Sequence, residues 1–172
     1  FNERICVNNH QISDKDVVES YQAVKRVHHG DRSPTFFEFA TAMAIYAFSR
    51  QKVDWAVIET GMGGRYDATN IIKPAISIIT NVSMEHRDYL GSTLAEIARE
   101  KAGIIKQATP VITAVRQKQA RSVLQKVARK KSAPLFMLRK DFKVRLHQSG
   151  HFSYYGFENT WRRLKTPLPG HF

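Results

Sequence analysis

Short apolar runs alternate along the chain with longer stretches whose apolar residues recur at helical spacing. The runs at 53–59, 75–80, 111–115 and 134–138 are bounded by turn residues, as is typical of buried strands. Helical patterns occupy 35–50, 94–106 and 116–131, whereas 60–70 is a loop by composition. Because strands that alternate with helices form βαβ units, the pattern predicts an α/β fold with a parallel sheet flanked by helices.

The two ends of the chain have a different character. Residues 4–8 predict a short strand, and an apolar stripe over 14–28 predicts a helix that Ser13 caps. Residues 141–157 predict a small antiparallel β hairpin near the C-terminus, with Ser149 and Gly150 at the turn.

Three local signals refine the helices. Ser33-Pro34 opens a helix over 35–50 that is apolar almost all round, and we therefore expect that helix to be buried. Thr93 and Glu96 have capping-box spacing at the start of the helix 94–106. Residues 116–131 predict a further helix, whose basic side chains we interpret as a solvated face.

Composition favours one domain in a reducing, cytoplasmic setting. The 172 residues are 42% hydrophobic, which suffices for a buried core, and no apolar run approaches the roughly 20 residues that span a bilayer. The N-terminus lacks the apolar core of a signal peptide, and Cys6 has no second cysteine to pair with. We expect neither membrane nor nucleic-acid partners.

The formal net charge of +12 keeps a polyanion-binding alternative open. Much of the excess lies in 116–145, where no aromatic stacking motif or zinc-finger spacing accompanies it. A basic nucleic-acid-binding domain is therefore the weaker interpretation.

Candidate chemistry lies in two loops that follow apolar runs. Ligands of parallel α/β sheets bind at the carboxyl ends of strands. Glu59 ends the first run and precedes a glycine-rich loop, where either a hard cation such as Mg²⁺ or Arg65 would balance its charge. The glycines fit both close approach to a ligand and a tight crossover turn. His86 follows the second run, where it is either a structural histidine or a contributor to a metal site shared with Glu59. Lys101 lies in a helix, where it is either solvated or buried beside the apolar stretch 102–105, and burial favours a neutral amine.

At these residues the chain resembles the folylpolyglutamate synthase and dihydrofolate synthase family, a branch of the Mur ligases. The resemblance runs in order through NERICVNN (2–9), TFFEFATAMAIYAF (35–48), DWAVIETGMGGRYDATN (54–70), ITNVSMEHRDYLGSTLAEIAREKAGIIK (79–106) and FENTWRRLKTPLPGHF (157–172). It implies ATP-dependent, Mg²⁺-assisted ligation of L-glutamate to dihydropteroate or folyl-glutamates through an acyl phosphate. It also implies a monomer with small-molecule partners only.

Residue roles follow from the resemblance, position by position. Glu59 and His86 match the magnesium-binding residues, and Lys101 matches a catalytic lysine that is N-carboxylated. The residues that match pteroate contacts are Thr35, Phe36, Phe37, Glu38, Tyr66, Asp67 and Ala68.

Two departures bear on these roles. The histidine loop reads Glu85-His86-Arg87 where the family usually has Asp-His-Thr, and the glycine loop carries Met62 and Tyr66 where the family usually has Leu. Tyr66 leaves the preferred folate open.

No G-x-x-G-K-[ST] phosphate loop occurs in the 172 residues. We therefore expect residues 1–172 to be part of a Mur ligase central, ATP-binding domain of the P-loop type. The expected missing parts are the upstream phosphate loop and the C-terminal glutamate-ligase domain, so the isolated chain would be inactive. A non-catalytic folate-binding module and another Mur-type amino-acid ligase remain as alternatives.

Overall fold

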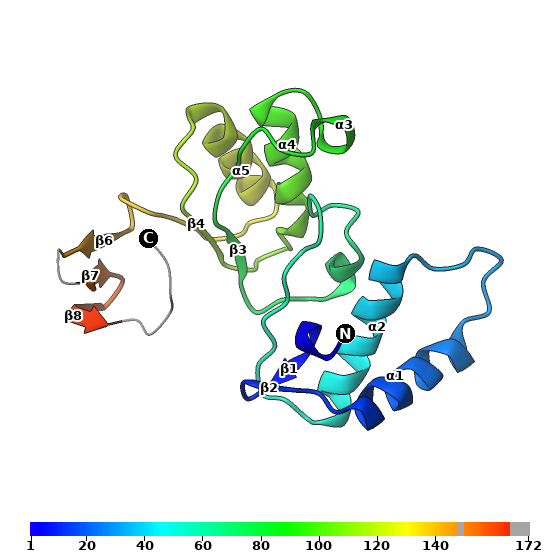
Figure 1. The fold of residues 1–172 in the computed structure, drawn as a ribbon. Helices are drawn as coiled ribbons and strands as arrows, with labels where there is room; N and C mark the ends of the chain where they lie inside the picture. Colours follow the sequence, from blue (N-terminus) through cyan, green and yellow to red (C-terminus); the bar gives the residue numbers. More distant parts are fainter. Residues whose placement is uncertain (148–149, 166–172) are drawn as a thin grey trace. The chain divides into compact units, whose positions relative to one another are not determined.

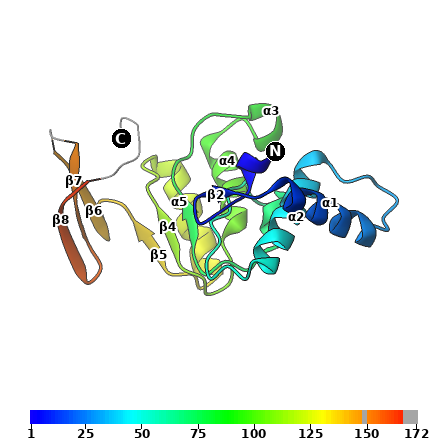
Figure 2. The same ribbon diagram turned by 60° about the horizontal axis from the view of Figure 1, so that its bottom comes forward.

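The computed structural model describes residues 1–147 and 150–165. The chain divides into two compact units, Phe1–Met62 with Asp67–Ile72 and Gly63–Tyr66 with Lys73–Phe172. The glycine-rich loop therefore contributes residues to both units. Figures 1 and 2 show the elements of each unit from two directions.

The first unit is built on two packed helices and a small hairpin. Its elements are η1 (Asn2–Arg4), β1 (Cys6–Val7), β2 (His10–Gln11), α1 (Asp14–Val27), α2 (Phe36–Arg50) and η2 (Ala68–Ile71). Ile5, Ile12, Met43 and Ala47 form its buried core. Capping boxes at Ser13–Asp16 and Thr35–Glu38 define where α1 and α2 begin.

The second unit contains a three-stranded parallel sheet in the order β3-β4-β5 and an antiparallel sheet in the order β6-β7-β8. Its elements are β3 (Ser77–Ile79), α3 (Arg87–Leu90), α4 (Leu94–Lys101), η3 (Ala102–Ile104), β4 (Val111–Thr113), α5 (Lys118–Lys130), β5 (Leu135–Met137), β6 (Phe142–Leu146), β7 (His151–Gly156) and β8 (Asn159–Lys165). Figure 1 shows α4 and α5 beside the parallel strands.

Helices α4 and α5 cover one face of the parallel sheet. Ile79 and Val111 from the strands pack with Ile97 from α4 and Leu124 from α5 in one buried cluster. The side chain of Thr113 is buried among them and donates a hydrogen bond to the Ile79 carbonyl at 2.7 Å. Its oxygen also accepts from a main-chain amide at 3.1 Å, so its polar atom is satisfied inside the core.

The α/β class, the parallel sheet and the Thr93–Glu96 capping box are confirmed. The predicted helix over 116–131 and the strands within 75–80, 111–115 and 134–138 are also present, with shorter bounds. The antiparallel hairpin is confirmed but has a third strand, β8, and Ser149 of its predicted turn lies outside the described residues.

Four predictions about secondary structure or burial were wrong in whole or in part. Residues 53–59 join no strand ladder among the described residues, and Val57 is 97% exposed, whereas a buried strand is paired and covered on both faces. Only Cys6–Val7 of the strand predicted over 4–8 is in a ladder. The helix predicted to be buried is partly open, with Phe36 64% exposed. The loop that carries His86 includes a short helix, α3.

Candidate active site

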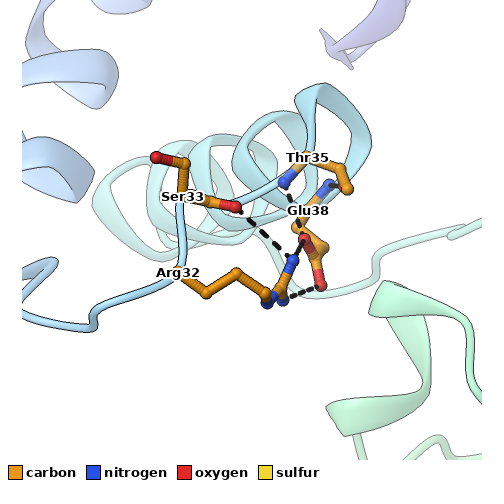
Figure 3. Close-up of polar contacts among 4 residues, drawn as sticks. All are labelled: Arg32, Ser33, Thr35 and Glu38. Atoms are coloured by element: carbon orange, nitrogen blue, oxygen red, sulfur yellow. Dashed lines mark hydrogen bonds and ion pairs between the residues drawn. The ribbon is translucent and has the colours of Figure 1, made fainter.

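The start of α2 is held by a network of polar contacts that one carboxylate organises (Figure 3). Oε2 of Glu38 accepts from the Thr35 amide at 2.7 Å, and Thr35 Oγ1 accepts from the Glu38 amide at 3.2 Å. The guanidinium of Arg32 donates to both Glu38 oxygens, at 2.7 and 3.1 Å. Arg32 and the Thr35 groups lower the pKa of Glu38 to about 2. Glu38 is therefore a fixed anion whose oxygens are engaged by the protein.

Next to this turn, the first unit contains a groove of about 630 Å³. Phe36 and Phe37 line it together with Glu59, Gly61 and Arg4. Its other lining residues are mostly apolar and come from α2, from the residues beside η1 and from the segment before Glu59. The groove combines aromatic walls with the exposed carboxylates of Glu3 and Glu59 and one exposed guanidinium, which suits a flat, polar-edged aromatic ligand.

Each glycine of the loop after Glu59 packs closely against a neighbour. A Cβ added to Gly61 would lie 2.6 Å from the ring of Phe37. One added to Gly63 would lie 2.8 Å from Leu90, and one added to Gly64 would lie 3.0 Å from the carbonyl oxygens of Glu100 and Lys101. The glycines thus serve close packing of the loop on its neighbours, which supports the crossover-turn interpretation.

Asp67 closes the part of the loop that belongs to the first unit. One of its carboxylate oxygens accepts from the amides of Gly61 and Met62, at 2.9 and 3.0 Å. The other accepts from the amide and the hydroxyl of Thr69, at 2.9 and 2.6 Å. Asp67 therefore orders the loop, while Ala68 begins η2 and Tyr66 is 87% exposed.

In the second unit, Lys101 ends α4 and its Nζ lies 3.1 Å from Oε1 of Glu85. The Lys101 side chain is 21% exposed. Lys101 lowers the pKa of Glu85, chiefly through this hydrogen bond. Glu85 directly precedes His86, so the pair ties the histidine loop to the end of α4. The ion pair requires a charged lysine, whereas carboxylation of the amine requires a neutral one.

His86 adopts the left-handed conformation, with φ 49° and ψ 42°, and precedes the first turn of α3. This φ is uncommon for a residue with a side chain and turns the backbone sharply after β3. His86 is exposed, so its imidazole is open to a ligand.

Magnesium requires oxygen-rich ligand sets, and the available donors fit it in part. Glu59 is exposed and makes no hydrogen bond or ion pair with the described residues, which leaves its oxygens available. Within the described ranges, no three His, Cys, Asp or Glu side chains gather into a metal-binding cluster. Glu59 belongs to the first unit, and His86 and Lys101 to the second. Arg65, the rival partner for Glu59, instead lies 3.8 Å from Glu100.

Sequence reasoning missed two side chains that shape the site. Glu85 was seen only as a departure from a family pattern, because its partner Lys101 is distant in the sequence. The Thr-Phe-Phe-Glu spacing at 35–38 is a capping-box signal that predicts the Glu38 contact with Thr35, but it carries no signal for Arg32. No helix in the described part of the chain has the length and apolar character needed to cross a bilayer.

The fold and these loops define the class of the protein. Residues 17–172 match the Mur ligase middle domain, and the chain belongs to that family. The dihydrofolate synthase/folylpolyglutamate synthase of Bacillus subtilis is 37% identical over 182 aligned residues, which cover 99% of this chain and 42% of the relative. The folylpolyglutamate synthase of Lacticaseibacillus casei is 35% identical, with the same coverage of both chains.

Solved structures agree with this placement. An FPGS–AMPPCP complex superposes with a TM-score of 0.90 at 36% identity, over 99% of this chain and 45% of that chain. The Escherichia coli FolC complex with DHPP and ADP gives a TM-score of 0.90 at 28% identity, over 98% and 40%. The chain thus spans about two fifths of the length of the curated relatives it matches.

Proposed function

We propose that this chain is the metal- and pteroate-facing part of a ligase that uses ATP to join L-glutamate to dihydropteroate or to folyl-glutamates. The observation that carries the proposal lies within the second unit, where Gly63–Tyr66 of the glycine loop pack on the end of α4, with the Arg65 amide bonded to the Glu100 carbonyl at 2.9 Å. Parts of two motifs that resemble one ligase family are thereby in contact. The family membership and the relatives named for glutamate addition to folates support the same activity.

The groove of the first unit is proposed to take the pteroate part of the substrate. Phe36 and Phe37 supply aromatic walls, and Gly61 leaves room beside Phe37. Thr35 and Glu38 act by holding the first turn of α2, because the Glu38 oxygens are already engaged. Asp67 acts in the same way on the loop that follows Gly61, where Tyr66 and Ala68 are its neighbours.

Glu59, His86 and Lys101 are proposed to serve the phosphate chemistry. Glu59 and His86 would hold Mg²⁺, which when bound neutralises charge on the phosphoryl oxygens. Lys101 would act in its N-carboxylated form. The amine must then leave its ion pair with Glu85 before it can be carboxylated. We further propose that the protein is cytoplasmic, and that the isolated 172 residues do not turn over because they contain no phosphate-loop sequence.

The test is the ATP-dependent release of phosphate by this chain extended to the length of its relatives. We expect release only when glutamate and a pteroate or folate acceptor are both present. Replacing Lys101 or His86 by Ala should lower turnover by orders of magnitude, whereas K126A on the exposed face of α5 should not change it. An unaltered turnover number in both site variants would overturn the assignment.

The same chain tests the folate-binding-module alternative. Calorimetry with dihydropteroate and, separately, with ATP and Mg²⁺ distinguishes the two functions. Binding of the pteroate by the extended chain without any turnover would favour the module. The groove lined by Phe36 and Phe37 is the feature that keeps this alternative in view.

A further inference from the structure

The antiparallel sheet β6-β7-β8 has two faces of opposite character. Register pairs Val144 with Tyr154 and Tyr154 with Trp161, and these side chains share an apolar face on which the rings of Tyr154 and Trp161 stack at 5.3 Å. The alternate residues lie on the other face. That face has no acidic residue in the three strands, and it carries Lys143, Arg145, Arg162, Arg163, Lys165, His147 and His151.

A β-bulge raises the density of arginines on this basic face. The register shifts between Phe152 and Tyr154, so Arg162 and Arg163 together oppose Ser153. Arg163 adopts a left-handed φ of 53°. Trp161 and Leu164 pair with residues of the apolar face, so both arginines between them lie opposite Ser153 of the basic face.

Ser153 fixes the middle of the basic face. It is buried, and its Oγ lies 2.8 Å from Nε2 of His147 and accepts from the Arg163 amide at 3.1 Å. One hydroxyl thus links all three strands beneath the cations. Lys143, Arg145 and Arg162 are exposed and form no ion pair within the described ranges. The face therefore presents an array of three exposed cations that lack acidic partners among the described residues.

The array has the dimensions of an extended anion rather than of a single phosphate pocket. Lys143 and Arg145 are two residues apart on β6, a separation of about 7 Å, and the arginines of the bulge lie two strands away, about 10 Å. Guanidinium forks bind carboxylates with two parallel hydrogen bonds. The stacked rings of Tyr154 and Trp161 lie on the opposite face. Tyr155 is the single aromatic residue of the three strands on the basic face, whereas single-stranded nucleic acid is bound by stacking successive bases on aromatic side chains.

The antiparallel sheet follows the same edge of the parallel sheet as the His86 loop, so a ligand bound to the sheet could be part of the substrate. The carboxyl ends of β3 and β5 lie at the same edge of the parallel sheet. β3 leads from that edge into the loop of His86, and β5 leads through Leu138–Asp141 into β6. The basic sheet and the proposed metal loop therefore start from one edge.

We propose that the basic face of β6-β7-β8 binds the oligo-γ-glutamate tail of a folate, an extended chain of carboxylates. The inference rests on the proposed function for the identity of its ligand. The binding itself requires neither ATP nor turnover, and it can therefore be measured separately.

The test is calorimetric titration of the 172-residue chain with a γ-linked oligoglutamate at low and at physiological ionic strength. Binding should weaken steeply with salt, because exposed pairs are screened over about 8–10 Å. The variant K143E/R145E should bind about tenfold more weakly or worse, since two attractions become repulsions. The control K118E/K126E makes the same charge change on α5 and should alter affinity less than about twofold.

Three results would overturn the proposal. They are equal losses in the two variants, tighter binding of an oligothymidylate of matched charge, and no binding by the unaltered chain at low salt. Circular dichroism and Trp161 fluorescence establish that K143E/R145E is folded, and K143Q/R145Q repeats the test without introducing negative charge. If oligoglutamate binding holds but the extended chain releases no phosphate, the proposed ligase activity fails and the anion site stands.

Discussion

Replacing Gly64 by Ala tests the joint between the glycine loop and α4. The added Cβ would lie 2.9 Å from Cγ2 of Ile104 and 3.0 Å from the carbonyl oxygens of Glu100 and Lys101. Ordinary contacts begin at 3.4 Å, so the groups must separate by about 0.4 Å. Two of the three neighbours are main-chain atoms of a helix end, and side-chain rotation cannot relieve the overlap.

The expected cost is about 1–3 kcal/mol, the usual range for overpacking a dense interior. For a chain of this size, each kcal/mol lowers Tm by roughly 2–4 °C. Urea unfolding followed by circular dichroism measures the free energy, and hydrogen exchange of the Arg65 amide reports on its bond to Glu100. G30A is the matched control, because a Cβ there meets only a side-chain atom at 3.4 Å. If G64A and G30A both have a free energy of unfolding within about 0.5 kcal/mol of the wild type, the packing argument is wrong.

Three further predictions concern polar contacts. The stabilisation that ionised Glu38 provides should be complete above about pH 4.5 and lost as pH falls through about 2. E38Q should therefore weaken the dependence of the free energy of unfolding on pH in this range, and it should speed hydrogen exchange of the Thr35 amide. Because the pKa of Glu85 is also lowered, its ion pair with Lys101 should likewise lose its stabilising effect as pH falls below about 4.5. Either E85Q or K101M should remove this contribution to the pH dependence of Tm, and a persistent dependence would contradict the ion pair. T113V should cost about 1–3 kcal/mol in urea unfolding, because the Val115 amide loses its acceptor and the Ile79 carbonyl retains the longer bond from the Ala114 amide, at 3.3 Å. An unchanged midpoint would refute that account.

Local signals account for the elements that the sequence predicted well. The Thr93–Glu96 capping box and the helix over 116–131 depend on residues within a few positions of one another. The run at 53–59 has the same apolar character as a buried strand, yet it forms no ladder in the described structure. Hydrogen-bonded pairing depends on a neighbouring segment, and periodicity within the run carries no information about that neighbour.

The candidate site was predictable as a set of residues, but its contacts were not. Glu59, Phe36 and Phe37 were identified through motifs, and the structure brings them to one groove. The contact of Lys101 with Glu85 and the ion pair of Arg32 with Glu38 depend on the path of the backbone through the loops that precede each helix contact, and no local spacing rule predicts that path. The roles of Glu59, His86 and Lys101 in holding Mg²⁺ and phosphate stay predictions.

The bulge in β8 also determines which length changes this strand tolerates during evolution. Loss of one of the two arginines opposite Ser153 would restore regular pairing and leave Leu164 on the same side as Trp161. Loss of a residue between the bulge and the turn at Phe157 would shift the register, and each displaced side chain would then lie on the opposite face of the sheet. Single-residue deletions among homologues should therefore gather at this one position, each removing a positive charge while the sheet persists.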